Sequence, residues 1–110
     1  MRTLKTDVAI IGAGAAGIPA AIEAAQAGVK VDVFEASDHA GGACNGGNGV
    51  FAVETRMQKQ KQYTYTKEQI LRYWMEYTHN NVDARLVSEF INRSADTVDW
   101  LMGYGVDLND

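Results

Sequence analysis

A short apolar run that leads directly into a glycine-rich turn constrains the fold of this chain more than any other feature. Residues Val8–Ile11 are too few for a helix and are typical of a strand buried on both faces. A G-x-G-x-x-G turn over residues 12–17 follows, and the small residues after it predict a helix over 15–27. A second apolar segment, Val31–Glu35, ends in an acid. This order predicts an α/β fold that begins with a parallel βαβ unit over residues 5–36.

The three glycines of the turn have separate physical tasks. Gly12 allows a sharp turn out of the strand, and Gly17 allows close packing of the helix on the sheet. Gly14 has no Cβ, so the backbone there can approach a pyrophosphate closely. The helix that follows directs its free amides and the positive end of its dipole toward such a group. The turn therefore predicts a phosphate-binding site.

Glu35 extends this prediction to a dinucleotide. It follows the turn at close to the spacing of about 20 residues that dinucleotide-binding units use. A carboxylate there can accept both hydroxyl hydrogens of an adenosine ribose and would repel a 2′-phosphate, which argues against an NADP-type ligand. Strand, turn, helix and acid together predict a Rossmann-like FAD/NAD(P)-binding unit. The alternative is a glycine-rich turn in an ordinary α/β protein.

Composition and charge exclude several other classes. The chain has 110 residues, of which 46% are hydrophobic, so it can build the core of about one domain. Its net charge is -4 and it has no long lysine or arginine cluster, which argues against nucleic acid and acidic membranes as partners. A single cysteine excludes an intrachain disulfide. We expect no transmembrane segment, no export segment and a cytoplasmic location.

The rest of the chain divides into a loop segment and a helical segment. Residues 37–65 have little periodicity and many glycines, which predicts a glycine-rich loop and linker. Residues 66–104 predict two helices. Thr66 with Gln69 forms a capping-box pattern, and Asp83 is the expected cap of the second helix. The predicted apolar faces comprise Ile70, Leu71, Trp74, Met75 and Thr78 in the first helix, and Leu86, Val87, Phe90, Ile91, Ala95, Val98, Leu101 and Met102 in the second.

Beyond the first turn, the sequence resembles a known family. A glycine pair, Gly41-Gly42, follows the acid, as in FAD-binding proteins of the two-dinucleotide type. The second glycine-rich loop and the run Ala52-Val53-Glu54-Thr55 resemble more narrowly the fumarate reductase and succinate dehydrogenase flavoprotein family. That family includes soluble fumarate reductases, urocanate reductases and 3-ketosteroid dehydrogenases. The segments 81–87 and 94–101 also resemble its helical region.

The resemblance implies that the cofactor is FAD and where it would bind. Ala16 would lie at the pyrophosphate, and Glu35 would hold the ribose. Residues 42–44 would line the path toward the isoalloxazine, and residues 47–49 would lie near the ring, where only small residues leave room. The implied cofactor-binding residues are Gly12, Gly14, Ala15, Ala16, Gly17, Glu35, Ala36, Gly41, Gly42, Ala43, Cys44, Gly47, Asn48 and Gly49.

Departures from the family pattern indicate how the flavin would be held. Membrane-bound members bond FAD covalently to a histidine in this loop, but no histidine lies between Gly41 and Glu54. His39 precedes the glycine pair and does not match. We therefore expect non-covalent FAD, which the resemblance links to a lower potential and to reduction of substrate. The soluble fumarate reductases tend to have Asn-Thr where this chain has Ala43-Cys44.

Family members are several times longer than this chain, so the resemblance implies an incomplete domain: the N-terminal part, residues 1–110, of an FAD-binding domain. The parent protein would be an FAD-dependent oxidoreductase that transfers a hydride between FAD and an activated carbon–carbon bond of a small-molecule substrate. Its catalytic residues would lie outside this chain, which alone would be inactive. The alternatives are a non-catalytic nucleotide-binding or interaction fragment, a 3-ketosteroid dehydrogenase-like protein, or another two-dinucleotide flavoprotein.

Several residues have a structural interpretation that we favour over a functional one. Trp74, Tyr77 and Trp100 stand at helical spacing and are expected in the core. Cys44 is expected to fill a tight loop, and His79 to interact with a helix C-terminus. No spacing indicates a metal site or a Ser-His-Asp arrangement. An uncovered sheet edge predicts self-association, and an electron-transfer subunit is a further expected partner.

Overall fold

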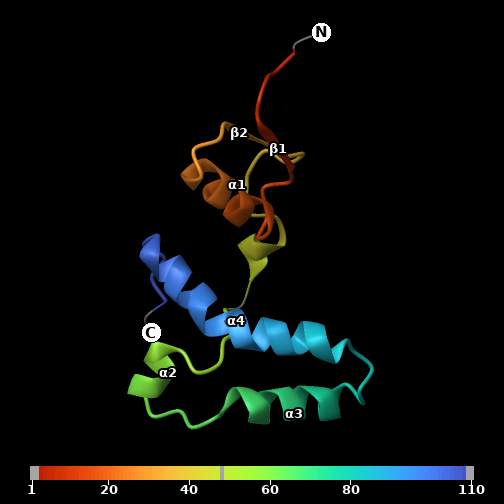
Figure 1. Cartoon of the computed structure of the whole chain (residues 1–110), viewed down its shortest axis with the longest axis vertical. Helices are drawn as coiled ribbons and strands as arrows, with labels where there is room; N and C mark the ends of the chain where they lie inside the picture. The colour runs from red at the N-terminus through yellow and green to blue at the C-terminus, as the bar shows by residue number, and fades with distance from the viewer. Residues whose placement is uncertain (1–2, 48, 109–110) are drawn as a thin grey trace. The chain divides into compact units, whose positions relative to one another are not determined.

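The computed structural model describes residues 3–47 and 49–108 of the chain, which form two compact units, Met1–Asn48 and Gly49–Asp110 (Figure 1). Each unit has its own secondary structure. In chain order the elements are β1 (Val8–Ile11), α1 (Gly17–Gln26), β2 (Val31–Phe34), the 3-10 helix η1 (Gly42–Gly46), α2 (Arg56–Gln60), α3 (Lys67–Tyr77) and α4 (Ala84–Gly103).

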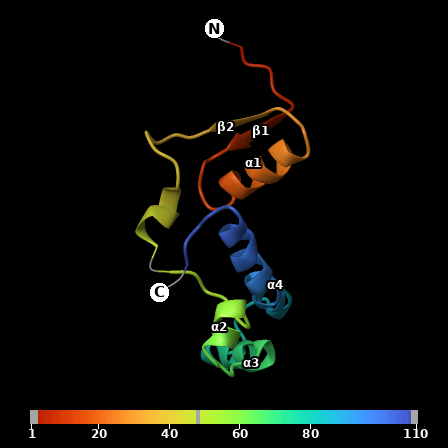
Figure 2. The same cartoon turned by 90° about the vertical axis from the view of Figure 1, so that its left-hand side faces the viewer.

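The first unit is a parallel βαβ arrangement, which confirms the predicted α/β class. Strands β1 and β2 pair in parallel with Val8 opposite Val31 and Ile11 opposite Phe34. Helix α1 packs against both strands (Figure 2). The helix begins at Gly17 and not at the predicted residue 15, because the backbone of residues 12–16 is used by the turn.

The first unit has a small core. Ala13 is its one buried hydrophobic residue among residues 3–47, whereas Ile11 is 83% exposed. Val33 and Phe34 of β2 are also exposed. The sheet therefore leaves apolar surface uncovered, and this unit buries little that could stabilise it alone.

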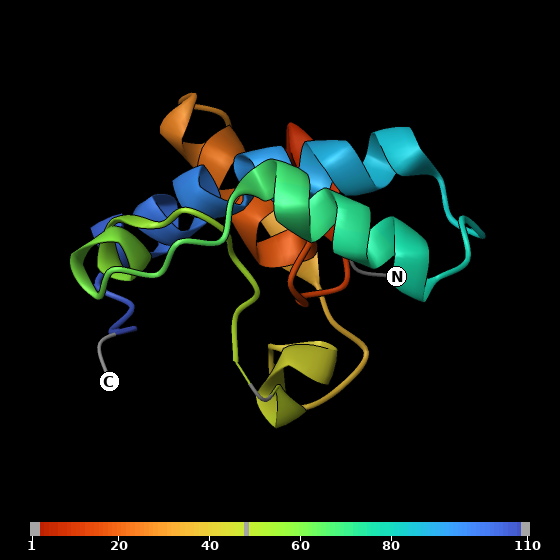
Figure 3. The same ribbon diagram turned by 90° about the horizontal axis from the view of Figure 1, so that it is seen from below.

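The second unit is built on α3 and α4, which lie side by side (Figure 3). Val53, Val87 and Ile91 form its buried cluster, and Ile70, Leu71 and Trp74 of α3 pack against that cluster. The ring of Phe51 contacts Trp74 edge-on, with centroids 5.4 Å apart, and stacks on Phe90 at 5.6 Å. The predicted apolar face of α3 is therefore the one that packs.

Part of the predicted core is exposed. Leu86 and Phe90 were expected on the buried face of α4, but they are 69% and 49% exposed. Tyr77 is 75% exposed and stacks on Tyr73 at the surface, so its expected core position is wrong. The apolar face of α4 is wider than the surface that α3 covers, which leaves its flank open.

The helix starts follow local capping rules. Thr66 and Gln69 form the predicted capping box at α3, and Asp83 accepts hydrogen bonds from two amides at the start of α4. A second capping box, Thr55 with Gln58, starts α2. Helix α2 and η1 lie within residues 37–65, where only loop and linker were expected. The T-x-x-Q pattern beginning at Thr55 was the available signal for α2.

The four α-helices of the described residues end in the same way. The residue after each C-cap has a positive φ, and its amide and the next one donate to carbonyls of the last helical turn, which is the Schellman geometry. The four residues are Gly28, Gln62, His79 and Gly105. In the described ranges, none of the helices combines the length and apolarity that a bilayer crossing requires.

Candidate functional site

Gly17 is required by packing at the start of α1. A Cβ on Gly17 would lie 1.8 Å from the carbonyl oxygen of Gly12 and 3.3 Å from Cγ2 of Ile10. Gly12 itself has a φ of +94°, and its amide donates to Phe34 O at 2.7 Å. These two glycines therefore allow the turn to close against the sheet, as the sequence predicted.

At Gly14, by contrast, the packing of the described residues gives no reason for a glycine. A Cβ on Gly14 would meet only the carbonyl oxygen of Gly41, at 3.9 Å, which is ordinary van der Waals contact. Its φ lies outside the left-handed region. The protein could therefore accommodate a side chain here, and the missing Cβ leaves space on the backbone surface. This space fits the close approach of a phosphate that the motif predicts.

The N-terminus of α1 is open to an anion. Ala16 is the N-cap and provides no side-chain hydrogen bond, and the first turn contains no acidic residue. The amides of the first turn and the positive end of the dipole are therefore not neutralised by a side chain. Together with the open space at Gly14, this terminus offers room and unneutralised positive charge to an anion.

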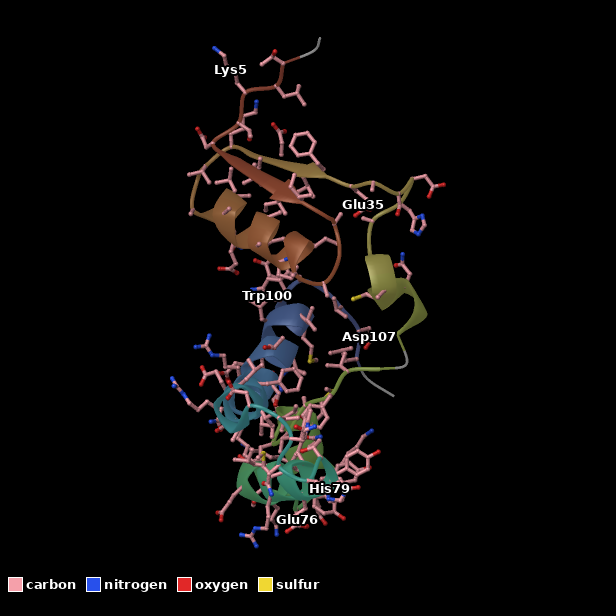
Figure 4. The ribbon with its side chains drawn as sticks, turned by 90° about the vertical axis from the view of Figure 1, so that its right-hand side faces the viewer. Lys5, Glu35, Glu76, His79, Trp100 and Asp107 are labelled. Atoms are coloured by element: carbon pink, nitrogen blue, oxygen red, sulfur yellow. The ribbon has the colours of Figure 1, made fainter. Side chains whose placement is uncertain are left out.

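Glu35 lies directly after β2, beside the turn that follows β1 (Figure 4). Its Oε2 accepts a hydrogen bond from the amide of Ala13 at 2.7 Å, and its Oε1 accepts one from the amide of Ser37 at 2.9 Å. These amides, Ser37 first, lower the pKa of the Glu35 carboxyl below its ordinary value. The residue is therefore ionised near neutral pH. Its hydrogen bond to the turn was not foreseen from the sequence.

The structure brings the glycine pair Gly41-Gly42 against the glycine turn that follows β1. The amide of Gly41 donates to Ala13 O at 2.7 Å, and a Cβ on Gly42 would lie 3.7 Å from the Cα of Gly14. Gly41 has a φ of +114°, and a Cβ there would lie 2.1 Å from Oδ1 of Asn45. Asn45, which the sequence did not single out, also donates to Ala40 O and so fixes this loop.

The remaining predicted site residues are distributed over both units. Cys44 is an exposed free thiol in η1. Gly49 begins the second unit, and Asn48 lies outside the described residues. The other members, all exposed in the first unit, are Ala15, Ala16, Ala36, Ala43 and Gly47. Among residues 3–47 and 49–108, no three His, Cys, Asp or Glu side chains gather as a metal site.

In the second unit, the segment after Gly49 is fixed by a buried serine. Oγ of Ser94 accepts a hydrogen bond from the Val53 amide at 3.0 Å and donates to Ile91 O at 2.7 Å. Glu54 has a φ of 60°, and its Oε1 accepts from the Lys67 amide, which starts α3. Ser94 was not singled out from the sequence, because a lone serine on an apolar helix face has no distinctive pattern.

The chain matches a family described as FAD binding domain over residues 7–110. It is 37% identical to the vinyl phenol reductase of Lactiplantibacillus plantarum over 101 residues, which cover 92% of this chain and 20% of that protein. It is 36% identical to a cytochrome-type fumarate reductase of Shewanella frigidimarina over 105 residues, or 94% of this chain and 18% of that protein.

A solved structure of a 3-ketosteroid-delta4-(5alpha)-dehydrogenase from Rhodococcus jostii RHA1 superimposes with a TM-score of 0.83 at 29% identity. The match covers 94% of this chain and 22% of that one. The chain thus spans about a fifth of the length of each of these relatives.

Proposed function

The chain belongs to the FAD-binding flavoproteins of the fumarate reductase family, and we propose that it forms the nucleotide-binding part of an oxidoreductase that reduces an activated carbon–carbon double bond. FAD, when bound, supplies the hydride for such a reduction. The residues of this chain bind and orient the cofactor, and the groups that handle substrate belong to the longer protein.

The relatives support this class of reaction. Two of them are named as reductases, of vinyl phenol and of fumarate, and both compounds contain a carbon–carbon double bond. A third is named as a dehydrogenase, which removes hydrogen from its substrate. Reduction is favoured here because two of the three relatives are reductases.

The observation that carries the cofactor assignment is the space at Gly14. Among the residues that the structure describes, no atom requires a glycine there, yet the position lies beside the uncapped start of α1 and the glycine pair at Gly41. A pyrophosphate would use this space, and its charge would be stabilised by the helix terminus.

The test compares two glycine substitutions in the same unit. Gly14→Ala is expected to weaken FAD binding about tenfold or more, measured by flavin fluorescence titration, because the added methyl group occupies the phosphate position. Gly46→Ala is the matched control, since a Cβ at Gly46 would have nothing within 4 Å and, like one at Gly14, would cause no clash. Equal FAD affinity for both variants would refute the assignment. A parallel titration with NAD tests the alternative ligand.

The proposed attachment of the flavin is non-covalent. The described part of the loop after Gly41 offers no histidine, and Cys44 is its one strong nucleophile. Acid precipitation of the FAD-loaded parent protein should leave the flavin in the supernatant. Flavin that stays with the pellet and migrates with the protein in a denaturing gel would contradict this proposal.

A further inference from the structure

The carboxylate of Glu35 joins two separate pieces of backbone. Oε2 binds the amide of Ala13 in the glycine turn, at 2.7 Å, and Oε1 binds the amide of Ser37 beyond β2, at 2.9 Å. The side chain therefore bridges the loop after β1 and the loop after β2. Hydrogen bonds to an ionised acceptor are among the stronger ones in proteins.

Ala13 is the point at which the turn is held. It is 6% exposed and lies between Gly12, with a φ of +94°, and Gly14, whose open surface is the proposed phosphate site. Its carbonyl oxygen accepts from the amide of Gly41, and its own amide donates to Glu35. Both backbone groups of this buried residue are thus satisfied by residues distant in sequence. Loss of the carboxylate would leave a buried amide without its acceptor, which is costly.

We propose that Glu35 is a positioning residue, which holds the glycine turn in its phosphate-binding conformation through Ala13, independently of any contact that Glu35 makes with the ribose hydroxyls. This inference rests on the proposed function. A carboxylate offers about four acceptor positions, so two amides leave capacity for ribose hydroxyls. The two roles are therefore compatible in one side chain.

Two nucleotides separate these roles. ADP contains the ribose 2′ and 3′ hydroxyls and the pyrophosphate, whereas 2′,3′-dideoxy-ADP keeps the adenine and the pyrophosphate but lacks both hydroxyls. Binding of both is measured by calorimetry on the full chain and on Glu35→Gln, in which a hydrogen-bond-donating NH2 group replaces one of the two oxygens that accept from the Ala13 and Ser37 amides. Asp38→Asn is the matched control, because it removes a negative charge nearby that is paired with His39 and not with the turn.

A positioning role predicts that Glu35→Gln weakens both nucleotides, by about tenfold for dideoxy-ADP, while Asp38→Asn changes neither by more than about twofold. Weakened ADP binding with unchanged dideoxy-ADP binding would overturn the inference, since Glu35 would then act through the hydroxyls alone. Failure of the unaltered chain to bind ADP would instead count against the proposed function.

A second measurement needs no nucleotide. Hydrogen exchange of the Ala13 amide, followed by NMR, should be about tenfold faster in Glu35→Gln than in the unaltered chain. If that variant does not fold, as judged by circular dichroism, Glu35→Asp keeps the charge but is one methylene shorter and should accelerate the same amide. An Ala13 amide that exchanges at the same rate in a folded variant would refute the positioning role.

Discussion

Two glycines of the same turn differ in what surrounds them. The space beside Gly17 is filled by the carbonyl oxygen of Gly12, 1.8 Å from where a Cβ would lie, whereas the space beside Gly14 is open. Gly17→Ala should therefore destabilise the first unit by about 2 kcal/mol or more, because backbone cannot yield as a flexible side chain does. Chemical denaturation measures this, with Gly46→Ala as the control. Matching stability in the two variants would show that the turn relaxes.

Glu35 makes the first unit sensitive to acid. The amides of Ser37 and Ala13 lower the pKa of the Glu35 carboxyl in the folded state. The ionised carboxylate therefore stabilises the fold at pH values above the ordinary pKa of 4.5. That contribution is lost as the pH falls through the lower, folded-state pKa. Unfolding followed between pH 7 and pH 3 should show declining stability below about 4.5. The decline should be shallower in Glu35→Gln, and parallel pH profiles would contradict this account.

Among the elements, α3 has the clearest local signal. Thr66 accepts a hydrogen bond from the Gln69 amide, and the Gln69 side chain accepts from Thr66. Thr66→Ala should cost the second unit about 1 kcal/mol, because it removes the cap of the helix that covers the buried cluster. Urea unfolding provides the measurement, and Thr64→Ala, in the exposed loop before the cap, is the control. An identical midpoint for both variants would show that the capping box contributes nothing.

Elements with local signals were predictable, and contacts between distant segments were not. The glycine turn, the caps at Thr66 and Asp83 and the two strands follow from short patterns, and the structure contains them. The bond from Glu35 to Ala13 depends on how two loops meet, which no pattern within either loop encodes. Leu86 and Phe90 were misplaced for a related reason, because periodicity identifies an apolar face but not how much of it a neighbour covers.

At the scale of the whole molecule, the chain divides into the units Met1–Asn48 and Gly49–Asp110. ADP should stabilise the first unit, which carries the glycine turn, by about 2.7 kcal/mol at a hundredfold excess over its Kd. Hydrogen exchange of the first-unit amides, followed by NMR, measures this effect. Unchanged exchange of those amides in the presence of ADP would contradict it. Self-association through the exposed sheet and a cytoplasmic location stay predictions, which light scattering and cell fractionation test.

The cluster of Phe51, Trp74 and Phe90 has a spectroscopic consequence. Both tryptophans and all five tyrosines of the sequence follow residue 49, and Phe34 is the one residue among Phe, Tyr and Trp before it. Tryptophan emission therefore originates in the second unit, and the unit that carries the glycine turn has no tryptophan or tyrosine of its own. The bound flavin, which has its own colour and emission, would then be the natural optical reporter for the nucleotide-binding half.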